Sequence, residues 1–524
     1  MSGPQHPHGP SGRGPAEVGP AASGRAGPCA LAAVDLGATS GRVMLGVVVE
    51  GRIELVPAHR FDNHLVRVDG HLCWDLDALW TEIRRGLRAA HDLAVGRGLG
   101  GLSAIGVDSW AVDYALVGPD ERDADGFPDP GSGTRRGEVI AYRDHRTDGV
   151  AETFAQQVSR QRQYALTGIA QQPFNTLYQL LTDDRVAGLP AGSTLLMLPD
   201  AIGHLLTGQR RTELTNASST GMLRVGGDGW AEELLAAAGV DRDLLAPFIA
   251  PGEVLGTVRP ALAGKLGIGD VPVIAVGSHD TASAVLAVPA HGDGPVAYIS
   301  SGTWSLIGLE LPPSAPTTEA LEAGFTHEGG IDGTVRFLKN VAGMWLVSES
   351  IRQWQDEGLD VDLEGLLAEA ATGPPARALI DPTDPQFLAP GRMADRVIAA
   401  ARPTGARPST PDPVLTTPAE VVRCLLESLA QTYREELATA CRLAGVARPE
   451  RLYVVGGGSQ NALLNQLTAD ALGLEVVAGP MEATALGNLA LQAAALGAVP
   501  AGRSSIRELV RASVELETFQ PSPA

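Results

Sequence analysis

One pattern occurs twice in this chain and constrains its fold more than any other feature: a short apolar segment, a turn of small residues, and a second apolar segment. The first copy comprises residues 31–36, 37–41 and 43–49, and the second comprises residues 296–299, 300–303 and 304–309. Short apolar runs bounded by glycine and serine are typical of buried β-strands. Two halves that open in the same way predict two related α/β domains.

Further helices and strands follow each copy. We predict strands at 53–56, 102–107, 271–276 and 452–455, and helices at 76–93, 282–288 and 463–472. In the segment 76–93, Leu79, Ile83 and Leu87 recur at helical spacing. Another helix is expected to begin after Thr417, because Pro418 and Glu420 complete a capping sequence, and to stop at Gly445.

The chain is too long for one ordinary domain, since it has 524 residues. Proline and glycine cluster at residues 289–295, which favours a domain boundary there. We therefore predict a disordered tail at 1–28, an N-terminal domain at 29–289, a C-terminal domain at 290–498 and a C-terminal tail at 499–524. The first 28 residues contain no apolar run, so they do not resemble a secretory signal.

Composition excludes several classes of function. With 40 Lys and Arg against 61 Asp and Glu, the net charge is −21, which disfavours binding to nucleic acid or to an anionic membrane. The four cysteines lack CxxC spacing, which argues against a disulfide framework or a zinc site. No segment approaches the roughly 18 apolar residues of a membrane span. We expect a soluble cytoplasmic protein, either a monomer or a small homo-oligomer.

Three loops of small residues follow predicted strands: Gly37–Gly41, Ser300–Thr303 and Gly456–Gly458. Backbone amides in such loops can converge on a phosphate, because no side chain blocks the approach. Any one of them could be an ordinary turn, but three at strand ends favour a nucleotide site. No GxxxxGK(S/T), HExxH or GxSxG motif is present. The GxGxxG at residues 96–101 follows a helix and precedes a strand, which is the wrong order for a dinucleotide fingerprint.

Asp280 is the most informative acidic residue, because it lies between a predicted strand and a predicted helix. The helix dipole favours an ionised carboxylate there, as a base that accepts a proton from a hydroxyl requires. Aspartate is equally common as a helix cap. The sequence alone leaves these two interpretations about even.

Together these segments resemble a known family. The matching segments are Val34–Arg42, the Asp280 site, Ser300–Trp304 and Gly456–Asn461. They resemble the FGGY carbohydrate kinases, members of the actin-like ATPase superfamily, in which two ribonuclease-H-like domains face a central cleft. The closer similarity is to the L-rhamnulose kinases of that family, through Tyr142–Asp144, Pro173–Leu180, His279–Ala284 and Leu338–Asn340. The resemblance covers about residues 31–496.

The resemblance implies a role for each matching residue. Asp280 would be the catalytic base, the N-terminal domain would bind the sugar, and the C-terminal domain would bind ATP. The implied sugar-binding residues are Ala111, His279, Asp280, Thr281 and Asn340. The implied ATP-binding residues are Ala38, Thr39, Ser40, Gly41, Arg42, Thr303, Ser348 and Gly457, with Asp35 near Mg²⁺.

Two positions depart from the family pattern. Ala111 stands where the L-rhamnulose kinases carry glycine, and its methyl group would narrow the sugar pocket. Ser348 stands where a longer amide side chain is usual. Substrate identity is therefore less constrained than the type of reaction.

The expected activity is ATP-dependent phosphorylation of L-rhamnulose to L-rhamnulose 1-phosphate, a step of L-rhamnose catabolism. Phosphoryl transfer needs positioning and charge neutralisation, which glycine loops, one carboxylate base and Mg²⁺ supply. The alternatives are a kinase of L-fuculose or xylulose, and a chaperone or filament protein with the same superfamily fold. A sugar-sensing regulator would require a DNA-binding module, which the tail 1–28 cannot supply.

Overall fold

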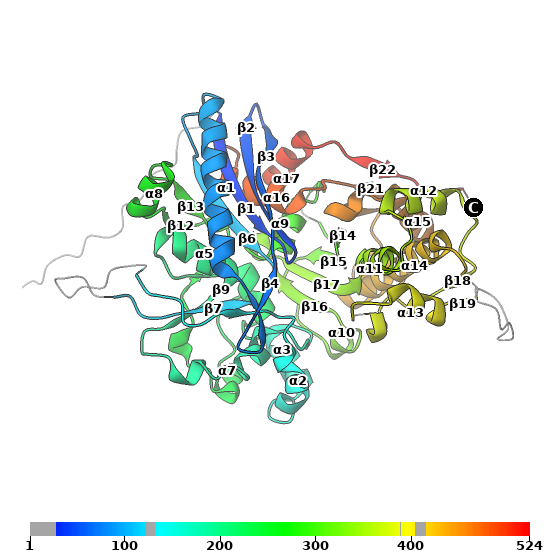
Figure 1. Cartoon of the computed structure of the whole chain (residues 1–524), viewed down its shortest axis with the longest axis horizontal. Helices are drawn as coiled ribbons and strands as arrows, with labels where there is room; N and C mark the ends of the chain where they lie inside the picture. Colours follow the sequence, from blue (N-terminus) through cyan, green and yellow to red (C-terminus); the bar gives the residue numbers. More distant parts are fainter. Residues whose placement is uncertain (1–27, 122–131, 293, 388, 404–414, 524) are drawn as a thin grey trace, which may run out of the picture.

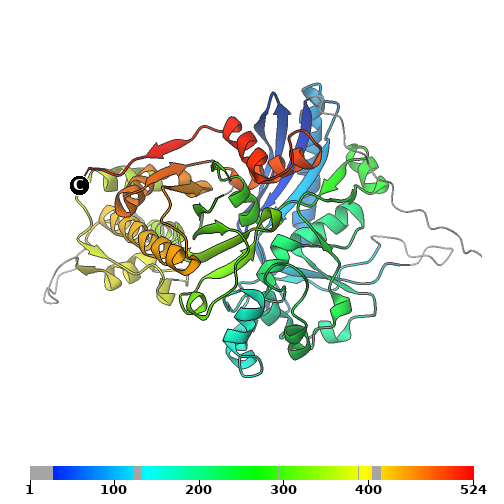
Figure 2. The same ribbon diagram turned by 180° about the vertical axis from the view of Figure 1, so that it is seen from behind.

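The structure is a computed structural model that describes residues 28–121, 132–292, 294–387, 389–403 and 415–523. All but the last residue of the predicted tail 1–28 lies outside this range. Two mixed β-sheets lie side by side and carry helices on their faces (Figures 1 and 2). Within the described residues no helix combines the length and the apolarity that crossing a bilayer requires.

The N-terminal sheet has the order β12-β13-β6-β1-β2-β3. Its strands are β1 (Cys29–Leu36), β2 (Ser40–Val49), β3 (Arg52–Asp62), β6 (Ala104–Ser109), β12 (Val254–Thr257) and β13 (Pro272–Ile274). The first three form an antiparallel meander, while β6 runs parallel to β1 and β13 runs parallel to β6. The hairpin β1–β2 is the first copy of the repeated sequence pattern.

The C-terminal sheet repeats this arrangement, with the order β16-β17-β15-β14-β20-β21-β22. Its strands are β14 (Val296–Ser301), β15 (Trp304–Leu311), β16 (Thr326–Gly329), β17 (Val335–Ala342), β20 (Arg451–Val455), β21 (Glu475–Ala478) and β22 (Glu517–Phe519). β14, β15 and β17 form an antiparallel meander, and β20 and β21 continue it in parallel from β14. The prediction of two related α/β domains is confirmed.

Most predicted elements form, with different limits. β3 is longer than the predicted 53–56, because it pairs with β2 as far as Asp62 opposite Ser40. The predicted strand 271–276 is too long. After Ile274 the chain leaves the sheet, and the Ala275 amide donates to the carbonyl of Glu253 instead.

Helices cover both sheets through the apolar stripes that the sequence shows. On α1 (Leu76–Gly96), Leu79, Ile83 and Leu87 are buried against the N-terminal sheet. On α14 (Pro418–Ala444), the capping box between Thr417 and Glu420 is formed as predicted. α14 packs with the C-terminal sheet in a second core.

A third core lies where the two halves meet. It contains α9 (Asp280–Leu286), α16 (Ala483–Ala495) and α17 (Arg503–Ser513) together with apolar residues of both sheets. The red end of the chain in Figures 1 and 2, which contains α17, accordingly lies beside the blue strands of the N-terminal sheet. In the chain, α9 connects β13 of one sheet to β14 of the other, while α16, which follows β21, packs on α9 and on β1 and β6 of the N-terminal sheet.

The segment set apart as a C-terminal tail, 499–524, carries α17 and β22. The fully buried Arg507 of α17 donates to Glu310 on β15 at 2.7 Å and to the carbonyl of Val285 on α9 at 3.1 Å. β22 pairs with β21 at the edge of the C-terminal sheet. This segment therefore ties the two halves together.

A smaller fourth core lies between β6 and β13 in the sequence. It includes β7 (Tyr114–Val117), β9 (Thr194–Met197), α4 (Thr176–Leu180) and α7 (Glu232–Ala238). The sequence analysis did not predict these elements. In Figure 1 they lie below the N-terminal sheet, in cyan and green.

Close packing of α16 on α9 gives a test of this architecture. A methyl group at Gly487 would overlap the carbonyl oxygen of Ser283 on α9, whereas one at Gly264, inside α8 (Pro260–Leu266), would meet no atom within 4 Å. Gly487→Ala is expected to lower the free energy of unfolding by about 1–3 kcal/mol. Gly264→Ala is expected to raise it by up to about 1 kcal/mol, through helix propensity. Denaturant titration measures both, and a Gly487→Ala protein as stable as the parent would contradict the packing.

Candidate active site

Three strand ends of the N-terminal sheet meet at one edge. β1 and β6 are parallel, and their register places Asp35 opposite Asp108. The next residue of β6, Ser109, pairs with His279 in the segment that follows β13, and its amide donates to the carbonyl of Ser278 at 2.9 Å. This edge therefore brings Asp35, Asp108 and the His279–Asp280 segment together.

Carboxylates dominate the electrostatics of this edge. Burial raises the pKa of Asp35, although the nearby Arg42 guanidinium opposes the shift. Burial and the charge of Asp35 raise the pKa of Asp108 well above its usual range, and Asp280 adds to that effect. A bound cation would lower the pKa values of both carboxyl groups, because a nearby positive charge favours the ionised form. The site is therefore suited to receive a cation.

The donor set fits a hydrated divalent cation. Oδ2 of Asp108 accepts from Asn488 at 2.5 Å, while the buried Oδ1 has no hydrogen-bond partner among the described residues. In those same stretches of the chain, no three Cys, His, Asp or Glu side chains come close enough to hold one ion. Mg²⁺ commonly binds through one or two carboxylates, with waters and phosphates as its other ligands. Asp35 and Asp108 match that requirement.

Arg42 joins the two halves of the chain. Its guanidinium lies 2.7 Å from Asp35 Oδ2 and 2.5 Å from Oε2 of Glu482, the residue before α16. Arg60 contacts the other oxygen of Glu482 at 2.5 Å. The structure thus places Arg42, a predicted phosphate-binding residue, in ion pairs with two carboxylates at the edge of the site.

The predicted phosphate loop between β1 and β2 is a hydrogen-bonded turn. The Gly37 amide donates to the carbonyl of Ser40 at 2.8 Å, and Asn63 donates to the carbonyl of Gly37 at 3.0 Å. Thr39 and Ser40 are exposed and Ala38 is half-buried, while Gly41 is buried, where a Cβ atom would overlap the Phe61 ring. The tip of the loop is therefore accessible to a ligand, and its base is fixed.

The other two glycine loops contact each other in the C-terminal half. Gly456 and Gly458 lie so close to Ser301 that a Cβ atom at either position would overlap it. Thr303 and Gly457 are exposed beside this contact. The sequence predicted that these loops share one ligand, and the structure brings these two loops together.

Ser348 lies near the same loops, on α11 (Trp345–Asp356). The carbonyls of Gly302 and Thr303 accept from the amides of Met344 and Trp345, which begin this helix. Ser348 is exposed one turn further along. Its role in nucleotide binding stays a prediction.

Asp280 is the first residue of α9, and the N-cap is His279. The alternative prediction, that Asp280 is the N-cap of this helix, is therefore wrong, because the cap is one residue earlier. One oxygen of its carboxylate accepts from the Thr281 amide at 2.5 Å and from the Thr281 hydroxyl at 3.1 Å. The side chain is 32% exposed, so the carboxylate can reach a ligand.

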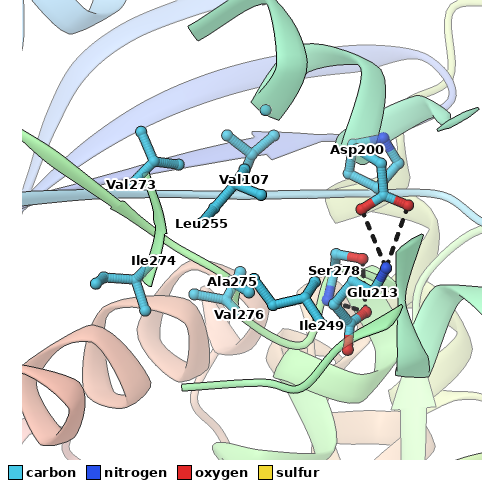
Figure 3. A pocket seen from close by; sticks show the side chains of 12 residues that line it. Val107, Asp200, Glu213, Ile249, Leu255, Val273, Ile274, Ala275, Val276 and Ser278 are labelled. Carbon is cyan, nitrogen blue, oxygen red and sulfur yellow. Dashed lines mark hydrogen bonds between the residues drawn. The ribbon is translucent and has the colours of Figure 1, made fainter. Parts of the chain in front are cut away.

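Glu213 holds Ser278, two residues before Asp280 in the chain, and both side chains are drawn in Figure 3. Its buried carboxylate accepts from the amide of Ser278 at 3.1 Å and from its hydroxyl at 2.6 Å. The Thr215 hydroxyl also donates to Glu213, at 2.6 Å, and accepts from the His279 amide at 3.3 Å. This network fixes the backbone on which Asp280 is mounted.

Asp200 lies next to Glu213 and accepts from its amide at 3.3 Å (Figure 3). Burial and the charge of Glu213 raise the pKa of Asp200 well above its usual range. Between them and Val107, Leu255 and Val273 lies a cavity of about 20 Å³, which has room for about one water molecule. It is too small for a sugar and lies behind the segment that carries Asp280.

Ala111 is half-buried in the turn after β6. The next residue, Val112, has a φ of +69°, a region that a β-branched residue rarely adopts. Its carbonyl accepts from Thr176 at 2.7 Å and from Gln179 at 3.1 Å, both in the segment Pro173–Leu180 that resembles the L-rhamnulose kinases. These contacts hold the strained turn and hence the position of Ala111.

Asp113 anchors the same turn from the other side. Its Oδ2 accepts from the indole nitrogens of Trp74 at 2.6 Å and Trp110 at 2.9 Å. Burial raises the pKa of Asp113 to about 6. The residue is enclosed by these partners, so the structure gives it a role in holding the turn.

Asn340 lies on β17 in the C-terminal half, with an exposed side chain. Within the described part of the chain, no hydrogen bond or ion pair joins its side chain to His279 or Asp280, so its sugar-binding role stays a prediction. Sequence reasoning did not assign a role to Glu213, Asp200 or Asn488, because each reaches the site only through long-range contacts. Asp108 could have been found by pairing the two predicted strands 31–36 and 102–107.

Comparison with known proteins gives one family for the whole chain. The N-terminal domain of the FGGY family of carbohydrate kinases matches residues 30–287, and the C-terminal domain of that family matches residues 297–496. The rhamnulokinase of Bacteroides thetaiotaomicron is 41% identical over 93% of this chain and 95% of that protein. The rhamnulokinase of Enterococcus faecalis is 39% identical over 94% of each chain.

Solved structures share the fold at low sequence identity. A ligand-bound xylulose kinase from Lactobacillus acidophilus has a TM-score of 0.72 and 18% identity over 94% of both chains. A glycerol kinase from Plasmodium falciparum with ADP has a TM-score of 0.74 and 15% identity, also over 94% of both chains. The predicted fold of two facing domains is confirmed.

Gly457 offers a direct test of the glycine loops. It is exposed in the 3-10 helix Gly457–Gln460, and a Cβ atom there would meet nothing within 4 Å. Gly457→Val is expected to raise the KM for ATP about tenfold or more, because its side chain would block the approach of phosphate or adenosine to the loop. The KM for sugar and the melting temperature should change little.

The matched control is Gly188→Val. Gly188 is also exposed, in the 3-10 helix Val186–Gly188, and also has open space around it. This variant should leave both Michaelis constants unchanged. A Gly457→Val protein in which only the sugar constant changes would remove this loop from the nucleotide site.

Proposed function

Because the chain belongs to the FGGY family of carbohydrate kinases, we propose that it uses ATP to phosphorylate L-rhamnulose at its 1-hydroxyl group. The observation that carries the proposal is full-length similarity to rhamnulokinases, at 37–41% identity over 93–94% of this chain. An acidic residue in the position of a base, three glycine loops and two facing domains are the features that such a reaction requires.

Asp280 is the proposed general base. Its carboxylate lies at the start of α9 and is partly exposed, so it can accept a hydrogen bond from the sugar hydroxyl. As the oxygen of that hydroxyl bonds to the γ-phosphorus, its proton passes to Asp280. The bond between the γ-phosphorus and the bridging oxygen breaks, and ADP leaves with that electron pair.

Asp35 and Asp108 are the proposed residues that hold Mg²⁺, directly or through its waters. When bound, the ion neutralises charge on the phosphates. The pair is already formed by the register of β1 and β6, so no rearrangement of the sheet is needed. Arg42 opposes the rise in the pKa of Asp35 and would contact the phosphates from the same side.

The nucleotide is proposed to lie against the C-terminal half, 290–498, and the sugar against the N-terminal half, 29–289. The nucleotide would be contacted on one side by Thr303, Gly457 and Ser348. Its phosphates would be contacted by Ala38, Thr39, Ser40 and Gly41. Enclosure between two domains excludes water, which would otherwise accept the phosphoryl group. The ion pairs of Glu482 with Arg42 and Arg60 link the halves beside this site.

The sugar site is proposed to include Ala111, His279, Thr281 and Asn340. Ala111 departs from the glycine of similar kinases, so the test must compare sugars. Purified protein with Mg-ATP should phosphorylate L-rhamnulose with a kcat/KM at least about tenfold above that for L-fuculose or D-xylulose. NMR of the product should show the phosphate at position 1. A higher kcat/KM for another ketose would leave a kinase with a different substrate.

Asp280→Asn tests the proposed base. Asparagine keeps an oxygen that can accept from Thr281, so the melting temperature and the affinity for ATP should be nearly unchanged. Loss of a general base typically lowers the rate by about 10²–10⁴-fold, and kcat should fall by that factor. Steady-state kinetics and nucleotide titration measure the two quantities.

Asp77→Asn is the control, because Asp77 also lies in the first turn of a helix, but its exposed side chain pairs with Arg135 at the surface. Its kcat should equal that of the parent. If Asp280→Asn retains kcat within a few-fold, the base is another carboxylate, and Asp35, Asp108 and Asp113 become the candidates.

A further inference from the structure

A buried charged cluster reaches the sugar-binding segment from the opposite half of the chain. His279, Glu328 on β16 and Arg336 on β17 are 7%, 9% and 0% exposed. Nδ1 of His279 lies 3.0 Å from Nη2 of Arg336 and 3.2 Å from Oε2 of Glu328. Neither Glu328 nor Arg336 has a role in the reaction described above.

The two partners of His279 are fixed before they reach it. Glu328 and Arg336 are opposite residues on adjacent antiparallel strands and lie 3.0 Å apart. Nε of Arg336 also donates to the carbonyl of Gly329 at 2.9 Å. The guanidinium is therefore held in one orientation, with Nη2 directed at the imidazole.

Nδ1 of His279 lies against a donor and an acceptor at once. A guanidinium only donates hydrogen bonds and stays charged at any ordinary pH. The Glu328 carboxylate accepts, and its Oε2 lies 3.2 Å from Nδ1, next to the 3.0 Å contact with Arg336. With or without a proton, Nδ1 therefore has a complementary partner, and the two residues together fix the position of the imidazole ring.

The geometry of the second nitrogen connects this cluster to the base. Nε2 of His279 lies 3.5 Å from Oδ1 of Asp280. The ring that Glu328 and Arg336 hold from the other side therefore presents Nε2 to the carboxylate of Asp280.

We propose that Arg336 and Glu328 are positioning residues that hold the imidazole of His279 with Nε2 directed at Asp280 and the bound sugar. The sugar contact rests on the proposed function, whereas the orientation of the ring does not. Because both residues lie on the C-terminal sheet, the sugar-binding segment of one half is completed by the other half. Correct seating of the C-terminal sheet is thereby coupled to the orientation of a sugar ligand.

Kinetics of two variants test the positioning role. Arg336→Lys keeps the charge but removes the fork that contacts both Gly329 and His279, and Glu328→Gln removes the counter-charge. Each should lower kcat/KM for the sugar about 10–100-fold, as expected for a lost charge-assisted hydrogen bond. The KM for ATP should stay within about twofold of the parent. An unchanged sugar kcat/KM would overturn the proposal.

Glu310→Gln provides the matched control. Glu310 lies on β15 opposite Arg336, is 2% exposed, and pairs with Arg503 and Arg507 rather than with His279. The Glu310→Gln variant should lower the melting temperature about as much as Glu328→Gln, but its kcat and KM for the sugar should equal those of the parent. If both variants lower the sugar kcat/KM equally, the role of Glu328 is structural only and the proposal is wrong.

NMR tests the positioning of the ring without any substrate. In ¹⁵N-histidine-labelled protein, the ring signals of His279, identified by their loss in His279→Gln, should shift clearly in Arg336→Lys and in Glu328→Gln and little in Glu310→Gln. Signals of His279 that are unchanged in the first two variants would overturn the proposal. This result is independent of the substrate. Failure of the parent to phosphorylate L-rhamnulose would instead count against the proposed function, and the kinetic test would then use the preferred ketose.

Discussion

The contact between α9 and α16 is the constraint on which the rest of the structure depends. α9 begins at Asp280 and α16 begins just after Glu482, so one helix pair fixes an acidic residue from each half. Gly487 allows the two backbones to approach more closely than any side chain would permit. The same contact brings Glu482 to Arg42 and Arg60, which lie on the N-terminal sheet. The two halves are thus joined by packing between helices and, at the edge of the site, by ion pairs.

Carboxylate groups at the site lie so close together that their mutual repulsion lowers the stability of the folded protein. Asp35 and Asp108 face each other on parallel strands with Asp280 nearby, and burial raises the pKa of both strand residues. Arg42 offsets only part of this charge. Such an arrangement costs free energy in the protein alone, and it is consistent with a site that binds a cation and a polyphosphate together. Segments behind the site, held by Glu213, keep the carboxylates in place.

Local patterns predicted much of the fold because they act over a few residues. The strand–turn–strand repeats, the stripe of α1 and the capping box of α14 follow from side-chain spacing and from hydrogen bonds within one turn. Limits were less predictable, since β3 and β13 end where pairing with a neighbouring strand ends. The fourth core, around α4 and α7, was not predicted, because its elements are short and its apolar residues come from distant segments.

By itself, the sequence determined the two-domain α/β architecture, the three glycine loops, and the placement of Asp280 between a strand and a helix. These features depend on residue types at short spacing. Only the tertiary structure decided that His279, not Asp280, is the N-cap of α9. It also decided that Glu213 contacts Ser278 and that Glu328 and Arg336 contact His279. Those contacts join residues 49 to 65 positions apart. Their geometry is set by the order and register of strands, which no short pattern in the sequence specifies.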